Sequence, residues 1–121
     1  MSEPPPFQLG YPGTELRRQL VAAVLSGEKT ATSGLADESE PPGPGDRFTL
    51  HDIDEQPVGV VELTEVRVVP AGGIDLDFAR DEGEGFESVE DWRAAHERFF
   101  EQPIHDDTPI VAPRFRLVER R

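Results

Sequence analysis

The chain opens with a helical repeat of apolar positions. Leu16, Leu20 and Val24 recur every four residues, which places them on one face of a helix. Thr14 can cap the start of this helix, because its hydroxyl can accept a hydrogen bond from a free backbone N–H group. Gly27 suits the left-handed conformation that ends many helices. The pattern therefore predicts a helix between Thr14 and Gly27.

Alternation typical of strands dominates the middle and the end of the chain. Residues 47–52 and 56–69 predict two strands joined by a turn, because the second run is rich in β-branched residues. These two strands imply a hairpin or meander. Residues 110–118 predict a last strand, in which Phe115 and Leu117 point inward and the arginines beside them point outward.

Two helical signals lie between these strands. Asp75 can cap a brief helical turn that runs through Ala79. Ser88 and Asp91 form a capping box, which predicts the start of a longer helix. The apolar stripe of that helix consists of Val89, Trp92, His96 and Phe99.

The segment after Gly27 is predicted to be a short strand followed by a loop. Residues 29–34 are rich in threonine, which favours a strand. Residues 36–45 contain acidic residues, prolines and glycines, which mark an exposed loop. This loop has two interpretations, a mobile lid over a site or a solvated connector.

The order of these elements predicts the fold class. Strands and helices do not alternate regularly, so a doubly wound parallel sheet is not expected. We predict an α+β fold, a small β-barrel with flanking helices. The length of 121 residues fits one domain, which we place at residues 10–121. The proline-rich residues 1–9 are expected to form a loose lead.

Composition narrows the function. The formal net charge is −13, so a polyanion meets a repulsive field and long nucleic acid is a poor default partner. A small uncharged ligand is barely affected by that field. Because cysteine is absent, there is no disulfide, thiol nucleophile or cysteine-ligated zinc site. The sequence shows no signal peptide and no membrane-spanning run, so we expect a cytoplasmic protein with no membrane partner.

Lys29 is the only lysine of the chain, and all other permanent cations are arginines. An amine can lose its proton where a guanidinium cannot, which makes Lys29 a candidate base. It can act so near neutral pH only if burial or a neighbouring cation favours its neutral form. The alternative is a surface lysine retained by chance. On a regular strand Lys29 and Thr32 point in opposite directions, so a bulge or a strand entry is needed to bring them together.

Three further side chains are candidates for chemistry. Glu82 and Glu84 are separated and followed by glycine, so each could project into a cleft and transfer a proton, or they could form a hydrated acidic loop. His96 lies on an apolar stripe, which favours a hydrogen-bonded core histidine over a ligand-binding one. The spacing of the acids matches no metal motif, and we expect neither a metal nor a cofactor.

Two common catalytic motifs are rejected. A P-loop needs glycine directly before its lysine, where this chain has Glu28. A Ser-His-Asp triad carries little weight, because no Gly-x-Ser-x-Gly elbow is present.

Four short motifs, taken in order, resemble the ASCH domain family from about Gly10 to Val118. They are Gly27-Glu28-Lys29-Thr30-Ala31-Thr32, Pro44-Gly45-Asp46, Glu82-Gly83-Glu84-Gly85 and Trp92-Arg93-x-x-His96-x-x-Phe99-Phe100. The resemblance implies a PUA-like fold whose cleft serves RNA or nucleoside ligands. That fold agrees with the α+β architecture predicted above.

One branch of the family is similar to bacterial amidohydrolases that remove the acyl group from N(4)-acetylcytidine. By motif position, the resemblance implies that Thr32 is the nucleophile, Lys29 takes its proton, and Glu82 assists proton transfer to the leaving amine. Many members carry an arginine shortly after the threonines, whereas Ser33 and Gly34 follow here. The ligand-holding cation is therefore either missing or supplied by Arg47, Arg93 or Arg114. The candidate substrate-binding residues are Thr30, Glu84, Arg93, His96 and Arg114.

Two alternatives to a nucleoside hydrolase remain open. A second branch of the family includes a protein described as a ribonuclease acting on single-stranded RNA, and Arg93, Arg114 and Arg116 could form a basic strip for such a partner. The third interpretation is a nucleotide-sensing domain that binds its ligand without turnover. No obligate protein partner is implied by any of the three.

Overall fold

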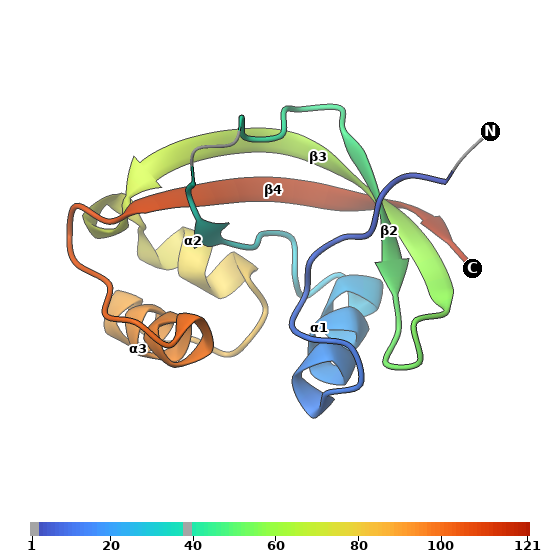
Figure 1. Ribbon diagram of the computed structural model, residues 1–121, viewed down its shortest axis with the longest axis horizontal. Coiled ribbons are helices and arrows are strands. Elements are labelled where there is room, and N and C mark those ends of the chain that lie inside the picture. Colours follow the sequence, from blue (N-terminus) through green and yellow to red (C-terminus); the bar gives the residue numbers. More distant parts are fainter. Residues whose placement is uncertain (1–2, 38–39) are drawn as a thin grey trace.

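A curved antiparallel sheet forms one layer of the molecule, and three α-helices lie on its concave side (Figure 1). The structure is a computed structural model that describes residues 3–37 and 40–121. The strand order is β1-β4-β3-β2, with every neighbouring pair antiparallel. The strands are β1 (Gly34–Leu35), β2 (Arg47–His51), β3 (Pro57–Pro70) and β4 (Pro109–Arg120). The predicted α+β class is confirmed, and the described strands form an open half-barrel.

The helices begin where the sequence predicts, and the first also ends there, whereas the second continues past the predicted Ala79 to Asp81. They are α1 (Glu15–Ser26), α2 (Leu76–Asp81) and α3 (Val89–Phe100), with a short 3-10 turn η1 (Ala71–Gly73) before α2. Thr14, Asp75 and Ser88 each accept a backbone hydrogen bond as the N-cap. Gly27 ends α1 in the left-handed conformation, with φ +87°. No helix among the described residues is long and apolar enough to cross a lipid bilayer.

Two apolar clusters divide the space beneath the sheet. The first packs α1 against β2, β3 and β4, and the second packs α2 and α3 against β4. Figure 1 shows α1 beneath one end of the sheet and α2 with α3 beneath the other. Because β3 and β4 are long and bent at irregularities in their register, one sheet covers both clusters. The sheet therefore covers the region between α1 and α3.

The amino-terminal lead is not loose, and this prediction is wrong for residues 3–9. Phe7 and Leu9 belong to the first apolar cluster. The N–H group of Phe7 donates to the carbonyl of Thr49 at 2.9 Å, which pairs the lead with the open edge of β2. Arg17, which is itself buried, donates from Nε to the carbonyl of Leu9 at 2.6 Å. The prolines of the lead suit an added edge strand, because they lack only the N–H group.

The predicted strand at residues 29–34 is confirmed only at its end. Gly34 and Leu35 pair with β4, and Ala31 makes an isolated bridge to Arg114. The N–H groups of Thr30 and Ala31 instead both donate to the carbonyl of Asp81, at the end of α2. This turns the backbone away from regular strand geometry. The described part of the loop at 36–45 forms no helix or strand.

Candidate active site

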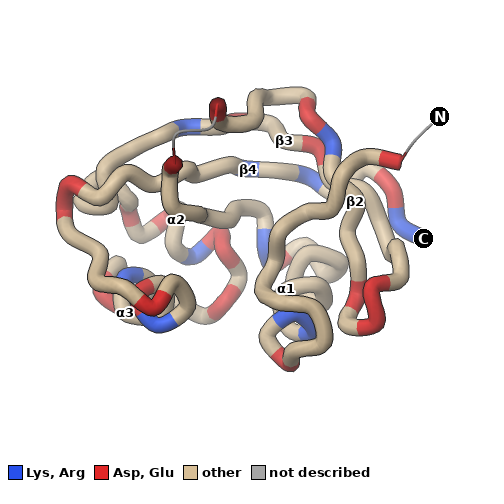
Figure 2. The backbone as a smooth tube through the Cα atoms, in the orientation of Figure 1, with Lys and Arg blue, Asp and Glu red and all other residues tan. Residues whose placement is uncertain are grey.

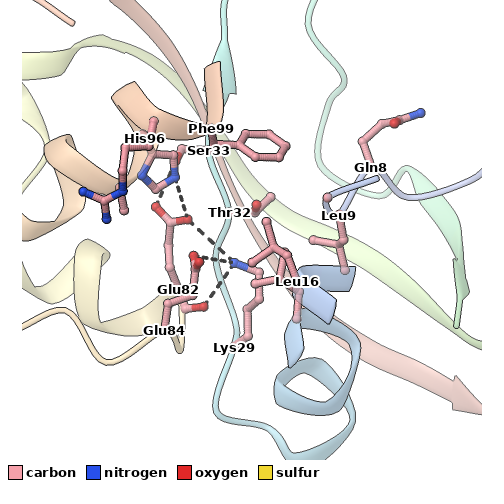
Figure 3. A pocket seen from close by; sticks show the side chains of 14 residues that line it. Gln8, Leu9, Leu16, Lys29, Thr32, Ser33, Glu82, Glu84, His96 and Phe99 are labelled. Carbon is pink, nitrogen blue, oxygen red and sulfur yellow. Dashed lines mark hydrogen bonds and ion pairs between the residues drawn. The ribbon is translucent and has the colours of Figure 1, made fainter. Parts of the chain in front are cut away.

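A pocket of about 430 Å³ opens between α1, α3 and the segment that follows α1. Leu9, Leu16 and Phe99 are among its apolar lining, whereas Lys29, Glu82, Glu84 and His96 form a polar group on one side. Thr32 and Ser33 also line it. Figure 3 shows the amine, the two carboxylates and the imidazole pointing toward one another.

Lys29 is buried, with 2% of its surface exposed. Its Nζ atom donates to the backbone carbonyl of Glu82 at 3.1 Å. The same atom lies 3.6 Å from Glu82 Oε1 and 3.8 Å from Glu84 Oε2. The sequence condition of a water-poor amine is therefore met, but its charged neighbours are two carboxylates rather than a cation.

Glu82 is the carboxylate at the centre of this group, with 1% of its surface exposed. Its Oε2 atom accepts hydrogen bonds from Trp92 Nε1 at 2.5 Å and from Ser33 Oγ at 2.8 Å. Burial favours the neutral acid, but the hydrogen bond from His96 and the charges of Lys29 and His96 outweigh burial, so the pKa of Glu82 is lowered. Glu82 is therefore an ionised carboxylate in the resting site.

Gly83 explains how the acidic segment reaches Lys29. Its φ of +71° lies in the left-handed region that favours glycine. A Cβ atom at this position would lie 2.8 Å from the Cα atom of Lys29 and from the carbonyl group of Glu28. Only a residue without a side chain allows the two backbones to approach so closely. Gly83 is thus required for close packing here, which is a stricter role than the general flexibility expected from the sequence.

His96 forms a hydrogen-bonded pair with Ser33. A carbonyl can only accept, so His96 Nδ1 donates to the backbone oxygen of Trp92 at 2.8 Å. This leaves Nε2 facing Ser33 Oγ at 3.0 Å and Glu82 Oε1 at 3.4 Å. Burial disfavours the imidazolium, but the hydrogen bond and the charge of Glu82 prevail, so the pKa of His96 is raised. The predicted core histidine therefore also faces the pocket.

Glu84 completes the group from a less buried position. Burial is the largest influence on it and, with the nearby charge of Glu82, raises the pKa of Glu84 despite the attraction of Lys29. The pKa values of the two glutamates of the motif are thus shifted in opposite directions. Glu82 is stabilised as the carboxylate, and Glu84 is displaced toward the neutral acid.

The same side chains include a donor set for a cation. Glu82, Glu84 and His96 each offer one atom, and these atoms lie within 4.8 Å of one another. Oxygen and imidazole donors suit several divalent metals. However, the ammonium of Lys29 lies within 4 Å of both carboxylates and already balances one negative charge of the group. A metal here would have to displace that ammonium.

Three of the predicted substrate-binding residues lie away from the pocket. Thr30 is exposed, Arg93 Nη1 forms an ion pair with Asp106 at 2.9 Å, and Arg114 Nη1 forms one with Asp81 at 2.6 Å. None of these three residues lines the pocket. Their positions do not support the prediction that they bind the substrate, whereas Glu84 and His96 do reach it.

Sequence reasoning missed Ser33 and the indole of Trp92 as parts of the site. The sequence marks Ser33 only as a departure from a family motif, and Trp92 only as an apolar position and a motif residue with no polar role. Ser33 follows Thr32 directly, and Trp92 lies one helical turn before His96 on the same face of α3. The signal for Trp92 is its indole N–H group, because a buried indole N–H normally finds a hydrogen-bond acceptor. The signal for Ser33 is its position directly after Thr32.

Comparison with known proteins agrees with this fold. Two solved structures each share 26% sequence identity with the chain. One is a protein from Enterococcus faecalis assigned to the family DUF984, with a TM-score of 0.86 over 99% of this chain and 79% of that one. The other is an ASCH domain from Lactobacillus crispatus, with a TM-score of 0.74 over 84% of this chain and 71% of that one.

A more distant structure shows the fold alone. It is an ASCH protein from Zymomonas mobilis, 17% identical, with a TM-score of 0.53 over 80% of this chain and 62% of that one. Among curated proteins, no significant sequence match is found. The family model described as the ASCH domain matches residues 8–119, nearly the whole chain. The chain therefore belongs to the ASCH domain family, as its four motifs predict.

Proposed function

We propose that this protein hydrolyses the amide bond of a small acylated nucleoside of the N(4)-acetylcytidine type. ASCH domains are generally RNA-binding or hydrolytic, and the site favours the second role. The observation that carries the proposal is the buried pair of Lys29 and Glu82 in a pocket that also presents hydroxyl groups. Buried ionisable groups in a cleft are typical of catalytic sites.

The reaction begins with a proton transfer inside the ion pair. Lys29 passes a proton to Glu82, whose Oε1 atom lies 3.6 Å away, and both groups become neutral. The raised pKa of Glu84 makes its protonation easier, and each protonation of Glu84 assists this step by removing one negative charge that holds the ammonium. The free amine of Lys29 is then able to accept a proton from a hydroxyl.

Acyl transfer follows on Thr32. Its hydroxyl gives its proton to Lys29 while the oxygen forms a bond with the acyl carbon. The carbon–nitrogen bond then breaks, and Glu82 returns its proton to the leaving cytosine amine. Water cleaves the acyl-threonine and releases the carboxylic acid. The site ends as it began, with an ammonium on Lys29 and a carboxylate on Glu82.

The surface supports a small neutral substrate over RNA. Arg93 and Arg114 are paired with aspartates, and Arg116 Nη2 lies 3.1 Å from Glu62 Oε1. Figure 2 shows acidic residues spread over helices, turns and strands, with basic segments scattered among them. A polyanion would have to displace these carboxylates and overcome the net charge of −13. A nucleoside entering the pocket faces neither cost.

The test is turnover of N(4)-acetylcytidine by the purified protein, with release of acetate and cytidine measured by chromatography. Lys29→Arg should lower kcat by at least about 100-fold, because a guanidinium does not deprotonate. The matched control is Arg67→Lys, which makes the reverse exchange at an exposed position of β3 and should leave kcat unchanged.

Three other outcomes are informative. Wild-type turnover equal to that of buffer would refute the proposal. Intact N(4)-acetylcytidine recovered after measurable binding would indicate a sensing domain instead. A labelled single-stranded RNA that is bound or cut at low salt would favour the RNA branch.

A further inference from the structure

A second cavity adjoins the first pocket at Thr32 and Ser33, which carry hydroxyl groups. Its volume is about 280 Å³, and its lining is mainly apolar. The lead contributes Phe7, the sheet contributes Phe48, Leu63 and Val111, and the wall continues at Pro42 and Pro113. No carboxylate, lysine or arginine lines this cavity among the described residues.

Thr32 and Ser33 separate the two cavities and line both of them. Gln8 is the other residue that the two linings share. On one side of this ridge lie Lys29 and Glu82, and on the other side lie aromatic and aliphatic side chains. A substrate whose reacting carbon sits at the ridge is therefore divided into a polar half and an apolar half.

We propose that the second cavity binds the acyl group of the substrate, and that this group is apolar and larger than acetyl. The inference rests on the proposed function, because it takes the scissile amide to lie at Thr32. The leaving amine must face the proton donor Glu82, which places the nucleoside in the first pocket. The acyl chain then extends across the ridge into the apolar cavity. Butanoyl, hexanoyl and benzoyl groups are of the expected class.

The size of the cavity supports this assignment. One water molecule occupies about 30 Å³ in the liquid, so a cavity of about 280 Å³ would leave an acetyl methyl group surrounded by unfilled space. Each CH₂ group of the acyl chain that is buried against these apolar walls should raise the binding constant, or kcat/KM, by about four-fold. A charged acyl group, such as succinyl, would lose its hydration without gaining a partner.

The first experiment measures kcat/KM for a series of N(4)-acylcytidines. The protein of residues 1–121 is assayed with the acetyl, butanoyl, hexanoyl and succinyl derivatives, and their kcat/KM values are compared. We expect a rise from acetyl to hexanoyl approaching four-fold per buried methylene, and turnover of the succinyl compound below that of the butanoyl one. A series that is flat, or that falls beyond acetyl, would overturn the inference and leave the proposed function standing.

Absence of turnover with every derivative would refute the proposed function instead. The cavity is then tested by affinity alone, with calorimetric titration of the same compounds. Tighter binding of hexanoylcytidine than of acetylcytidine supports an apolar acyl site. Equal affinities overturn it.

The second experiment fills the second cavity with a larger side chain. Gly34 lines the second cavity, its φ is outside the left-handed region, and a Cβ atom there would meet nothing within 4 Å. Gly34→Leu should therefore fold and should lower the hexanoyl-to-acetyl ratio of kcat/KM, or of affinity, by about ten-fold or more. The control is Gly43→Leu, where a Cβ atom is equally unobstructed and which lines neither cavity. An unchanged ratio in Gly34→Leu contradicts the proposal.

Discussion

Two groups of oppositely charged side chains differ in their exposure to solvent, one around Glu62 on the sheet and one around Glu82 beneath it. On the sheet, Glu62 accepts hydrogen bonds from Arg47 at 3.0 Å and from Arg116 at 3.1 Å, and both arginines are more than half exposed. Beneath the sheet, Lys29 and Glu82 are both almost fully buried. Water and salt screen the first group, whereas the second holds its charges only because each is matched.

The two glutamates show why a shifted pKa alone does not identify a site. The pKa of Glu62 is lowered by hydrogen bonds from Arg116 and Arg47, with little burial to oppose them. The pKa of Glu82 is lowered even though burial, the largest influence on it, acts in the opposite direction. The direction is the same, but for Glu82 the surrounding hydrogen bonds and charges overcome burial as the largest opposing influence, and for Glu62 they do not have to. Burial distinguishes the catalytic candidate from the surface ion pair.

The largest expected effect comes from deleting the buried cation. Lys29→Met keeps the length of the side chain but leaves two carboxylates without their ammonium. We expect a loss of about 3–5 kcal/mol in the free energy of unfolding, measured by urea denaturation. Adding Glu82→Gln to this variant should recover part of that loss.

The matched change in the exposed group sharpens the contrast. Arg47→Met removes one partner of Glu62, and its effect should fall within the error of the fit, because exposed ion pairs contribute little. Equal losses in the two variants would erase the distinction between the groups.

A smaller effect is expected from the glycines that shape the acidic segment. Gly83→Ala should cost about 1–3 kcal/mol and reduce turnover, because the new methyl group meets the backbone at Lys29. Gly85 is the control, since its φ is +81° but a Cβ atom there meets nothing within 4 Å. Gly85→Ala should show only the backbone cost, about 1 kcal/mol, with turnover retained. Identical behaviour of the two variants would show that the close approach is unimportant.

The smallest effect is a dependence of stability on pH. Because the pKa of His96 is raised above its ordinary value of 6.5, the folded state keeps a proton that the unfolded state releases. The resulting stability is fully present below pH 6.5 and is lost as pH rises through the folded pKa.

The slope for one proton is at most about 1.4 kcal/mol per pH unit. Urea titrations of the wild type and of His96→Asn between pH 6 and pH 9 measure it. The wild type should lose stability relative to the variant across this range. Parallel curves would mean that His96 gains no proton affinity on folding.

The sequence predicted those parts of the molecule that depend on neighbours along the chain. Thr14, Asp75 and Ser88 are caps whose partners lie three residues away, so the helix starts follow from local pattern. The burial of Trp92 and His96 follows in the same way from the periodicity of α3.

Contacts between distant segments could not be predicted in this way. The lead became part of the core through Arg17 and the edge of β2, neither of which is its neighbour in sequence. The pairing of Ser33 with His96 spans 63 residues. Lys29 and Glu82 were both expected at the site, but their mutual contact depends on the close approach at Gly83, which spacing alone does not reveal.

The backbone of residues 29–32 has a consequence for how the site meets its ligand. All four N–H groups of this segment are bonded, to the carbonyls of Ala23, Asp81 and Pro113, although none of the four residues belongs to a helix or a ladder strand. The backbone that carries the amine of Lys29 and the hydroxyl of Thr32 is consequently fixed before anything enters the pocket. The conformational entropy of this backbone is lost during folding, so binding of a ligand does not have to order it again.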